Sequence, residues 1–409
     1  MSPNIPIPSR FTRLIDVIFG YKRALAAVRE LPRGVWIICA GTFLNKFGSF
    51  VVPFLTLYLT TKGFSLVNAG LAVGCYGIGN LFASILGGFL ADRIGRRKTI
   101  VISMIAAGIT MTLLGTAHQL WAIFALTALT GLASELYRPA SSALIADLVP
   151  PENRVTAFCV YRIALNAGWA FGPATAGFLV KYSFSWLFVG DAMTSLLYAI
   201  VAVAWLPEGL RTARQEAHWA TALKGALSNF EFLKVLASSF LIGLMFFQMS
   251  STFGVHVINQ GLSAEVYGRL ISFNGLLIVL FELPVSTWTQ KLKPQRIIPV
   301  GYSLVGIGFG IAAFAHDVWS LLFSVIVFTI GEMLSIPIAS AYAANMCPAN
   351  ARGRYLGLVS MTWSLALVVG PSVGLRGLAW NPAAFWLLFS TCGFLAAWVI
   401  STSKIKQPA

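Results

Sequence analysis

Charge is scarce in this chain, and negative charge is the scarcest. Only 11% of the 409 residues are Asp, Glu, Lys or Arg, and the 14 acids are outnumbered by 29 Lys and Arg. Soluble domains are about 25% charged, whereas 57% of this chain is hydrophobic. This composition excludes an ordinary soluble domain and predicts an integral membrane protein.

Cysteine and histidine are also rare, with five and four residues. The cysteines fall in or beside apolar stretches without paired spacing, so we expect structural thiols and no disulfide, metal or cofactor. No P-loop, paired metal ligands or nucleophile triad is found, and the loops are too short for a catalytic domain. The sequence therefore predicts neither an enzyme nor an ATP-driven pump.

Long apolar runs, by contrast, are abundant. About 20 such residues cross the roughly 30 Å of bilayer hydrocarbon, and the chain holds twelve candidate runs. The predicted spans are 35–61, 66–91, 99–117, 119–147, 155–180, 184–206, 235–258, 266–289, 297–315, 318–345, 355–375 and 383–402.

The basic residues follow topology rather than forming a nucleic-acid surface. If the N-terminus is cytoplasmic, most of the Lys and Arg lie in the tails and even-numbered loops. We therefore expect both termini in the cytoplasm and no nucleic-acid partner. On the opposite side lie only Lys62, Lys181, Arg269 and Arg376.

An internal repeat appears when the chain is shifted by 198 residues. The shift places Gly63 on Gly261, Arg154 on Arg352, and Gly172-Pro173 on Gly370-Pro371. One unbroken offset indicates two homologous halves. The predicted division is a cytoplasmic tail at 1–33, six helices at 34–206, a cytoplasmic linker at 207–234, six helices at 235–402 and a tail at 403–409.

The N-terminal tail shows no cleavable signal, so the first helix is expected to act as its own insertion signal. Apolar residues at 11, 14, 15, 18 and 19 have helical spacing and basic neighbours. This pattern fits an interfacial amphipathic helix, and a partly ordered tail is the alternative.

A charged loop follows the second predicted helix, with the pattern G-x-L-A-D-R-x-G-R-R-K at residues 88–98. It resembles the signature loop of the major facilitator superfamily of transporters. The resemblance implies an all-α membrane protein of twelve helices in two pseudo-symmetric halves. It also implies a latch that locks the halves, with an acid of the fourth helix as partner; a purely topogenic loop is the alternative. The expected latch residues are Gly88, Asp92, Arg93, Gly95, Arg96, Arg97 and Asp147.

The fifth predicted helix is similar to the G-P motif of the antiporter branch of that superfamily, which favours export. Small residues at four-residue spacing allow close helix packing, and proline bends a helix. The branch's arginine motif in the fourth helix is missing, because Thr127 stands at the arginine position. The expected kink and packing residues are Gly168, Gly172, Pro173 and Gly177, with Gly370 and Pro371 in the second half.

Three ionisable residues are predicted to lie near the membrane midplane. At 1.5 Å per helical residue, Lys46, Glu135 and Glu332 lie roughly 18–20 Å from the cytoplasmic helix ends. We predict a Lys46–Glu135 pair with Glu332 facing it, and Glu135 and Glu332 as proton-coupling acids. A static salt bridge is the alternative.

Other polar residues within the predicted helices are candidates for contacts with a substrate. Arg138 and Arg162 are predicted to form a cationic shelf for an anionic or zwitterionic substrate; snorkelling or pairing with Glu135 is the alternative. Glu282 is expected to pair with Lys291 or Lys293. Asp191 is expected to be structural. The predicted substrate cavity comprises Asn45, Lys46, Asn80, Arg138, Arg162, Gln248 and Asn274.

The predicted function is proton-coupled efflux of small, drug-like or amphiphilic molecules by alternating access, by a monomer in the bacterial inner membrane. One alternative is a proton-coupled importer of a small polar or anionic solute such as a peptide, amino acid or sugar. Another is a non-transporting receptor or lipid-handling protein on the same fold.

Overall fold

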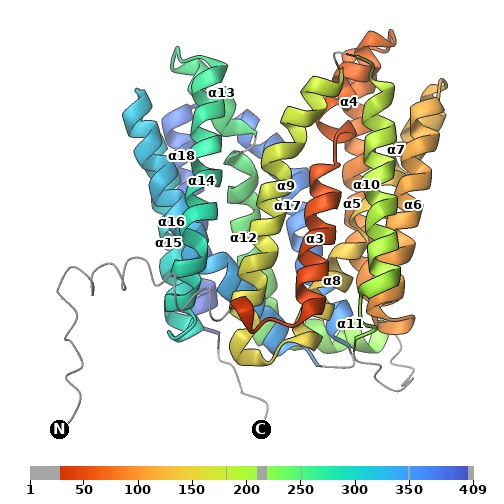
Figure 1. Cartoon of the computed structure of the whole chain (residues 1–409). Helices are drawn as coiled ribbons and strands as arrows, with labels where there is room; N and C mark the ends of the chain where they lie inside the picture. The colour runs from red at the N-terminus through yellow and green to blue at the C-terminus, as the bar shows by residue number, and fades with distance from the viewer. Residues whose placement is uncertain (1–27, 181, 210–218, 250, 349–350, 404–409) are drawn as a thin grey trace, which may run out of the picture.

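The computed structural model describes residues 28–180, 182–209, 219–249, 251–348 and 351–403, and these form helices joined by short turns (Figure 1). The interfacial helix predicted at 11–19 lies outside the described residues. So do Lys181 and residues 210–218 of the predicted linker.

The apolar runs of the N-terminal half form helices close to their predicted spans, because a helix satisfies its backbone N–H and C=O groups internally, as lipid requires. These helices are α3 (Arg33–Phe47), α4 (Val51–Thr61), α5 (Leu66–Arg93), α6 (Arg96–Thr116), α7 (Leu120–Glu135), α8 (Tyr137–Leu148), α9 (Arg154–Val180) and α10 (Ser185–Trp205), with a 3-10 turn η1 at Pro151–Asn153.

The C-terminal half follows the same order after a short helix, α11, in the linker. Its elements are α11 (Trp219–Ser228), α12 (Phe230–Met249), α13 (Thr252–Asn259), α14 (Ala264–Thr289), α15 (Pro294–Ala312), α16 (Val318–Met346), α17 (Arg352–Trp380) and α18 (Pro382–Ser401).

Ten helices in the described ranges are long and apolar enough to cross a membrane by themselves. The first predicted span is absent from that set because it breaks into α3 and α4. The ninth, α15, is absent because its polar first turn, Pro294-Gln295-Arg296, lowers its hydropathy. Large apolar side chains such as Phe82, Trp121 and Trp319 are exposed, as expected where a helix faces lipid.

The internal repeat is visible in the turns. Gly63 and Gly261, which are 198 residues apart, both have a left-handed φ, of 87° and 77°. Each precedes a serine cap: the Ser65 hydroxyl accepts from the N–H of Asn68, and the Ser263 hydroxyl accepts from the N–H of Val266. A glycine with positive φ and a serine cap thus precede both α5 and α14, as expected for equivalent helices of the two halves.

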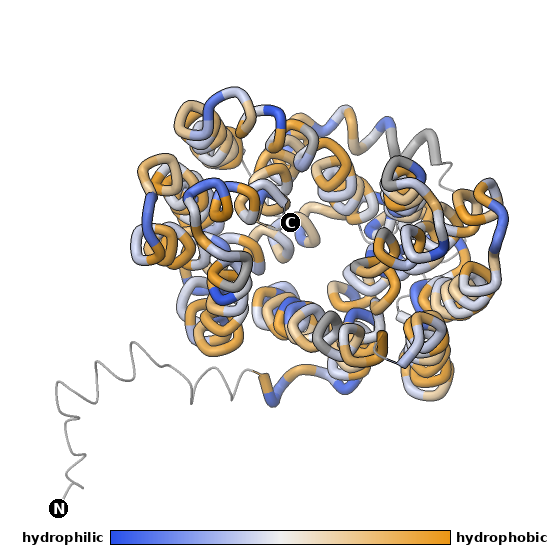
Figure 2. The backbone as a smooth tube through the Cα atoms, turned by 90° about the horizontal axis from the view of Figure 1, so that it is seen from above, coloured by the Kyte–Doolittle hydropathy of each residue, from blue (hydrophilic) through white to orange (hydrophobic). Residues whose placement is uncertain are grey.

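The two halves meet through a few helices. In the view from above they form two neighbouring groups of mainly hydrophobic helices (Figure 2). Contacts between the groups join α5 and α8 to α17, and α9 to α14 and α16. The connection between α5 and α6 lies at one end of the molecule, called here the Gly95 end; α4 and α13 lie at the other (Figure 1).

Candidate functional site: buried charges and the contact between the halves

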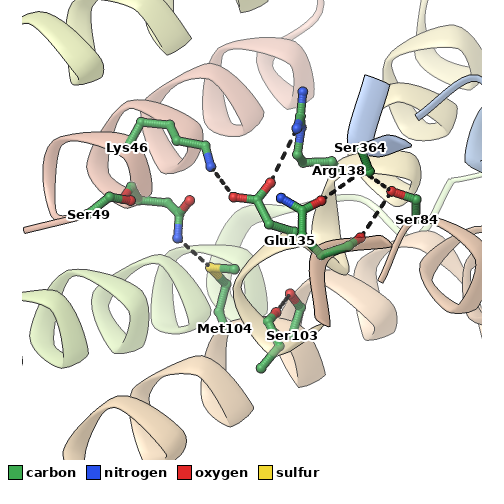
Figure 3. Close-up of polar contacts among 11 residues, drawn as sticks. Lys46, Ser49, Ser84, Ser103, Met104, Glu135, Arg138 and Ser364 are labelled. Carbon is green, nitrogen blue, oxygen red and sulfur yellow. Dashed lines mark hydrogen bonds and ion pairs between the residues drawn. The ribbon is translucent and has the colours of Figure 1, made fainter. Parts of the chain in front are cut away.

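Three charged side chains form a cluster inside the N-terminal half (Figure 3). Lys46 Nζ, on α3, donates to Glu135 Oε1, at the end of α7, at 2.6 Å. Arg138 Nη1, on α8, donates to Glu135 Oε2 at 3.4 Å. The Lys46 and Glu135 side chains are 4% and 7% exposed, whereas that of Arg138 is 37% exposed. The predicted Lys46–Glu135 contact is confirmed, and the cluster has one positive charge in excess.

A second cluster lies between the halves and has the opposite imbalance. Arg162, on α9, donates through Nη1 to Glu282 Oε1 of α14 at 2.6 Å and through Nη2 to Glu332 Oε1 of α16 at 3.1 Å. Asn274 Nδ2 donates to Glu332 Oε2 at 3.0 Å. Both acids are buried. One guanidinium thus joins two carboxylates of the other half, leaving one negative charge in excess.

This geometry corrects three predictions. Glu282 pairs with Arg162 and not with Lys291 or Lys293, which are exposed at the end of the bundle. Glu332 contacts Arg162 and Asn274 instead of facing the Lys46–Glu135 pair. Arg138 and Arg162 do not form a shared cationic shelf, because each binds acids of a different cluster. A buried carboxylate pairs with the cation that helix packing brings closest to it. The depth of a residue along its helix does not identify that cation.

Asn80, also predicted to line the cavity, makes a polar contact between the halves. Its Oδ1 accepts from the Ser364 hydroxyl of α17 at 2.8 Å. The Ser364 and Ser84 hydroxyls are 2.9 Å apart, so α5 and α17 share a short hydrogen-bonded seam near mid-helix.

Asn45 and Gln248 make buried packing contacts in the described conformation. Gln248 is fully buried, and its Nε2 donates to the carbonyl of Gly370 at 2.9 Å. Asn45 is 3% exposed, and its Nδ2 lies 3.6 Å from Met104 Sδ. Both side chains join helices within one half, where a buried amide is held by partners in its own bundle.

At the Gly95 end, two acids bind groups from both halves. Asp92 accepts hydrogen bonds from the backbone N–H groups of Gly353 and Arg354, both at 2.9 Å, at the start of α17. Asp147 pairs with Arg352 of the C-terminal half and, at 3.0 Å, with Arg96. The two carboxylates tie α5 and α8 to the positive end of α17.

The second repeat makes the equivalent contacts with neutral amide side chains as the acceptors. Asn345 is the 198-shift equivalent of Asp147, and it accepts from Arg154, the equivalent of Arg352. Gln290, the equivalent of Asp92, accepts from the Thr156 hydroxyl at 3.0 Å. The contacts at the Gly95 end therefore have approximate two-fold symmetry, with acids in one copy and amides in the other.

Glycines allow the backbones to approach at this end. A Cβ on Gly88 would lie 2.4 Å from the carbonyl oxygen of Gly353, and one on Gly353 would lie 2.6 Å from the carbonyl oxygen of Gly88. Gly95 has φ 105°, which permits the sharp turn into α6. Arg93 and Arg97 remain in their own half: Arg93 lies over the Phe89 ring, and Arg97 donates to a carbonyl of α10.

The G-P motif of α9 packs against α3. A Cβ on Gly168 would lie 2.7 Å from Lys46 Cβ, and one on Gly172 would lie 2.7 Å from the carbonyl oxygen of Phe47. Gly177 has more room, with its nearest neighbour at 3.8 Å. Pro173 lies within α9, as Pro371 lies within α17. These glycines bring α9 against the break between α3 and α4.

Asp191 supports that same break. It is buried on α10, and its Oδ2 accepts from the N–H of Val51, the first residue of α4, at 3.5 Å. A carboxylate at a helix N-terminus satisfies a backbone donor that has no intrahelical partner. The contact agrees with the predicted structural role.

Sequence reasoning missed the groups that α17 and α14 supply, namely Arg352, the Gly353 and Arg354 amides, and Glu282 as a partner of Arg162. The repeat could have identified Arg352, since it aligns with Arg154. Nothing comparable pointed to the amides, because any residue except proline provides an N–H.

Comparison with known proteins was made against family models, curated sequences and solved structures. The model of the Major Facilitator Superfamily matches residues 38–304 and 259–409. An uncharacterized MFS-type transporter of Bacillus subtilis, YttB, is 30% identical over 84% of this chain and 88% of its own length.

Two further relatives have named activities. A Na⁺, Li⁺, K⁺/H⁺ antiporter of Planococcus maritimus is 24% identical over 91% of this chain and 97% of its own length. The multidrug resistance protein MdtH of Salmonella arizonae is 23% identical, covering 88% of this chain and 91% of its own length. Among solved structures, the human organic anion transporter MFSD10 superposes with a TM-score of 0.72 at 16% identity, over 90% of this chain and 99% of that one. This last similarity concerns the fold alone.

Proposed function

Because this chain belongs to the major facilitator superfamily, and is thus a multi-pass membrane transporter and not an enzyme, we propose that it exports small amphiphilic molecules in exchange for protons. The observation that carries this proposal is the Arg162 cluster. It combines a direct contact between the halves with a buried excess of acid. Proton binding by an acid of this cluster would change the contact between the halves. Alternating access requires that contact to break.

The names of two relatives support the proposal: one is a cation/proton antiporter and one a multidrug resistance protein. The G-P motif of the fifth membrane helix points the same way. We thus propose an amphiphilic cargo, the proton as coupling ion and export as the direction of transport.

The sidedness is proposed from the positive-inside rule, which assigns the Gly95 end and both termini to the cytoplasm. In a bacterial inner membrane, the described conformation would then be closed toward the cytoplasm by Asp92, Asp147 and Arg162. We propose that this closed end acts as the latch, and that opening it exposes the midplane to cytoplasmic cargo.

Of the two acids predicted to take part in proton coupling, Glu332 belongs to the cluster that the geometry favours and Glu135 does not. Both Glu135 oxygens accept from cations in a cluster with an excess positive charge, which stabilises the ionised carboxylate. Glu332 shares one guanidinium with a second acid, so its cluster can accept a proton without acquiring a net charge.

A second candidate function is uptake of a small anionic solute. Arg138 favours it, because its partly exposed guanidinium belongs to a cluster with a spare positive charge. A carboxylate of a peptide or an organic acid would neutralise that charge. This alternative differs from export in the direction of coupled flux.

The test uses proteoliposomes with an acidic lumen and a lumenal pH indicator. Tetraphenylphosphonium, a dipeptide or a hexose is added outside, and proton release is measured for the wild type, Glu332→Gln and Glu135→Gln. We expect the lipophilic cation to release protons and Glu332→Gln to abolish the release. The control is Glu231→Gln, which alters an acid of α12 whose partner is the neighbouring Lys234.

Proton-linked flux with the dipeptide alone, in the uptake direction, would support the importer. Absence of proton-linked flux in the wild type with every compound would remove the coupling mechanism.

A further inference from the structure

The two acids beside Arg162 differ in how their oxygens are used. Both Glu332 oxygens accept hydrogen bonds, one from Arg162 and one from Asn274. Glu282 accepts through Oε1 only, and its Oε2 is buried without a hydrogen-bond partner among the described residues.

A buried carboxylate oxygen without a donor is costly when the group is ionised, because nothing replaces the water it has lost. A proton on that oxygen removes the charge and breaks no existing hydrogen bond. A proton on Glu332 would sit on an oxygen that already accepts from Arg162 or Asn274 and would weaken that bond. The cluster also requires one added proton to reach neutrality, since two carboxylates face one guanidinium.

We propose that Glu282 carries the coupling proton, on Oε2, and that Arg162 converts its loss or gain into a change in the contact between the halves. This inference rests on the proposed function and assigns its proton to a residue that sequence reasoning did not select. Glu332 is then the positioning acid, which keeps Arg162 oriented while Glu282 titrates.

Within the described part of the chain, few charged or titratable groups surround Glu282. From α9 come Arg162 and Cys159, and from α16 comes Glu332. The α13 helix packs against the far end of α14, where Gly254 faces Tyr267. Arg162 remains a cation throughout, because a guanidinium is not deprotonated in proteins. The only step is therefore transfer of one proton between Glu282 Oε2 and water.

The proton alters the strength of the link between α9 and α14. When both acids are ionised, Arg162 is attracted by two carboxylates of the other half; when Glu282 is protonated, one of these becomes a neutral hydrogen-bond partner. Neutralising the carboxylate removes its Coulomb attraction to Arg162 and leaves a weaker hydrogen bond from a cation to a neutral oxygen. Protonation thus favours separation of the halves, and deprotonation favours the closed arrangement.

The first measurement is an infrared pH titration of the purified protein in lipid, without cargo. We expect the wild type to show a protonated-carboxyl C=O band that titrates and Glu282→Gln to lack it. Glu332→Gln should keep a titrating band that is shifted to lower pH, because Glu282 then faces Arg162 as the single carboxylate of the cluster. Glu282→Asp keeps the carboxyl group and is expected to show a shifted band. It serves as the readout if the glutamine variant does not fold.

The second measurement is the distance between two spin labels, attached at positions 98 and 293 through the substitutions Lys98→Cys and Lys293→Cys in a background without native cysteines. In the wild type, acidification is expected to lengthen this distance at the Gly95 end. In Glu282→Gln it is expected to be long at every pH, because the substitution mimics the protonated form.

A band lost in Glu332→Gln and retained in Glu282→Gln would overturn the assignment, as would a band unchanged in both glutamine variants or in Glu282→Asp. A distance in Glu282→Gln that still follows pH would overturn the coupling through Arg162. Because neither measurement uses cargo, a failure of proton-linked export in proteoliposomes would leave these results standing and would refute only the proposed function.

Discussion

At the scale of single residues, the two charge clusters have opposite imbalances. Lys46 and Arg138 surround one acid, whereas Arg162 is shared by two. A buried pair contributes little net stability when intact, but removing one partner leaves an uncompensated charge. The excess in each cluster therefore decides which substitution is harmful.

In the first cluster, Glu135→Gln is expected to destabilise the protein far more than Lys46→Met. The glutamine removes the carboxylate that both cations contact, at a cost of about 3–5 kcal/mol in the free energy of unfolding. The methionine leaves a balanced Glu135–Arg138 pair, so its cost is smaller.

The measurement is detergent-mediated unfolding in mixed micelles, with the double variant Lys46→Met/Glu135→Gln included. The double variant should be more stable than Glu135→Gln alone, because only the partly exposed Arg138 then lacks an acid. Equal destabilisation by the two single changes would show that the charge excess does not control stability here.

At the scale of elements, the helices at the Gly95 end are close because their facing residues are glycines. Gly88 on α5 meets Gly353 on α17, and Gly357 on α17 meets the carbonyl oxygen of Ser84. Small residues at a helix interface permit backbone contact, and lipid gives no hydrophobic reason for two helices to associate otherwise.

Gly88→Val is expected to prevent closure of this end, because even a Cβ at that position would lie 2.4 Å from a backbone oxygen of the other half. The population should shift toward the conformation open at the Gly95 end, which lengthens the distance between labels at positions 98 and 293. The matched control is Gly74→Val, on the same helix, where a Cβ has no neighbour within 4 Å. If both variants retain the wild-type distance, the glycine contact does not limit closure.

The elements themselves were largely predictable. The twelve predicted spans correspond to helices, but three of them each cover two: the first covers α3 and α4, the fourth α7 and α8, and the seventh α12 and α13. The contact of Asp191, a side chain of another helix, with the N–H at the start of α4 was not predicted. A local pattern contains no information on such a partner.

At the scale of the whole molecule, the contact between the halves is symmetric in position and asymmetric in charge. Asp147 binds Arg352 and Arg96, whereas its equivalent Asn345 binds Arg154. The internal repeat accounts for the shared geometry, and the presence of acids in one copy and amides in the other makes the two sides unequal in strength.

Asp147→Ala is therefore expected to open the Gly95 end more than Asn345→Ala does. The aspartate holds two guanidinium groups through charge-assisted bonds, and the asparagine holds one through a neutral acceptor. Double electron–electron resonance between labels at 98 and 293 measures the open fraction of each variant. A larger open fraction for Asn345→Ala would contradict the view that the charged copy dominates closure.

The sequence by itself determined the class of the protein, the number and approximate limits of its membrane helices, the two-fold repeat and the superfamily. These features follow from apolar run length, the 198-residue offset and the 88–98 motif, all of which are local or periodic along the chain. It also led to the Lys46–Glu135 pair, since a buried charge at a known depth requires an opposite charge at that depth.

Only the tertiary structure decided which charges are partners across the halves. The sequence suggested Lys291 or Lys293 for Glu282, and the fold supplied Arg162, 120 residues away. It likewise brought Asp92 to the backbone of Gly353 and Arg354. The physical reason is that electrostatic and hydrogen-bond energies depend on the distance between atoms, and that distance is set by how helices far apart in the chain pack and rotate against one another.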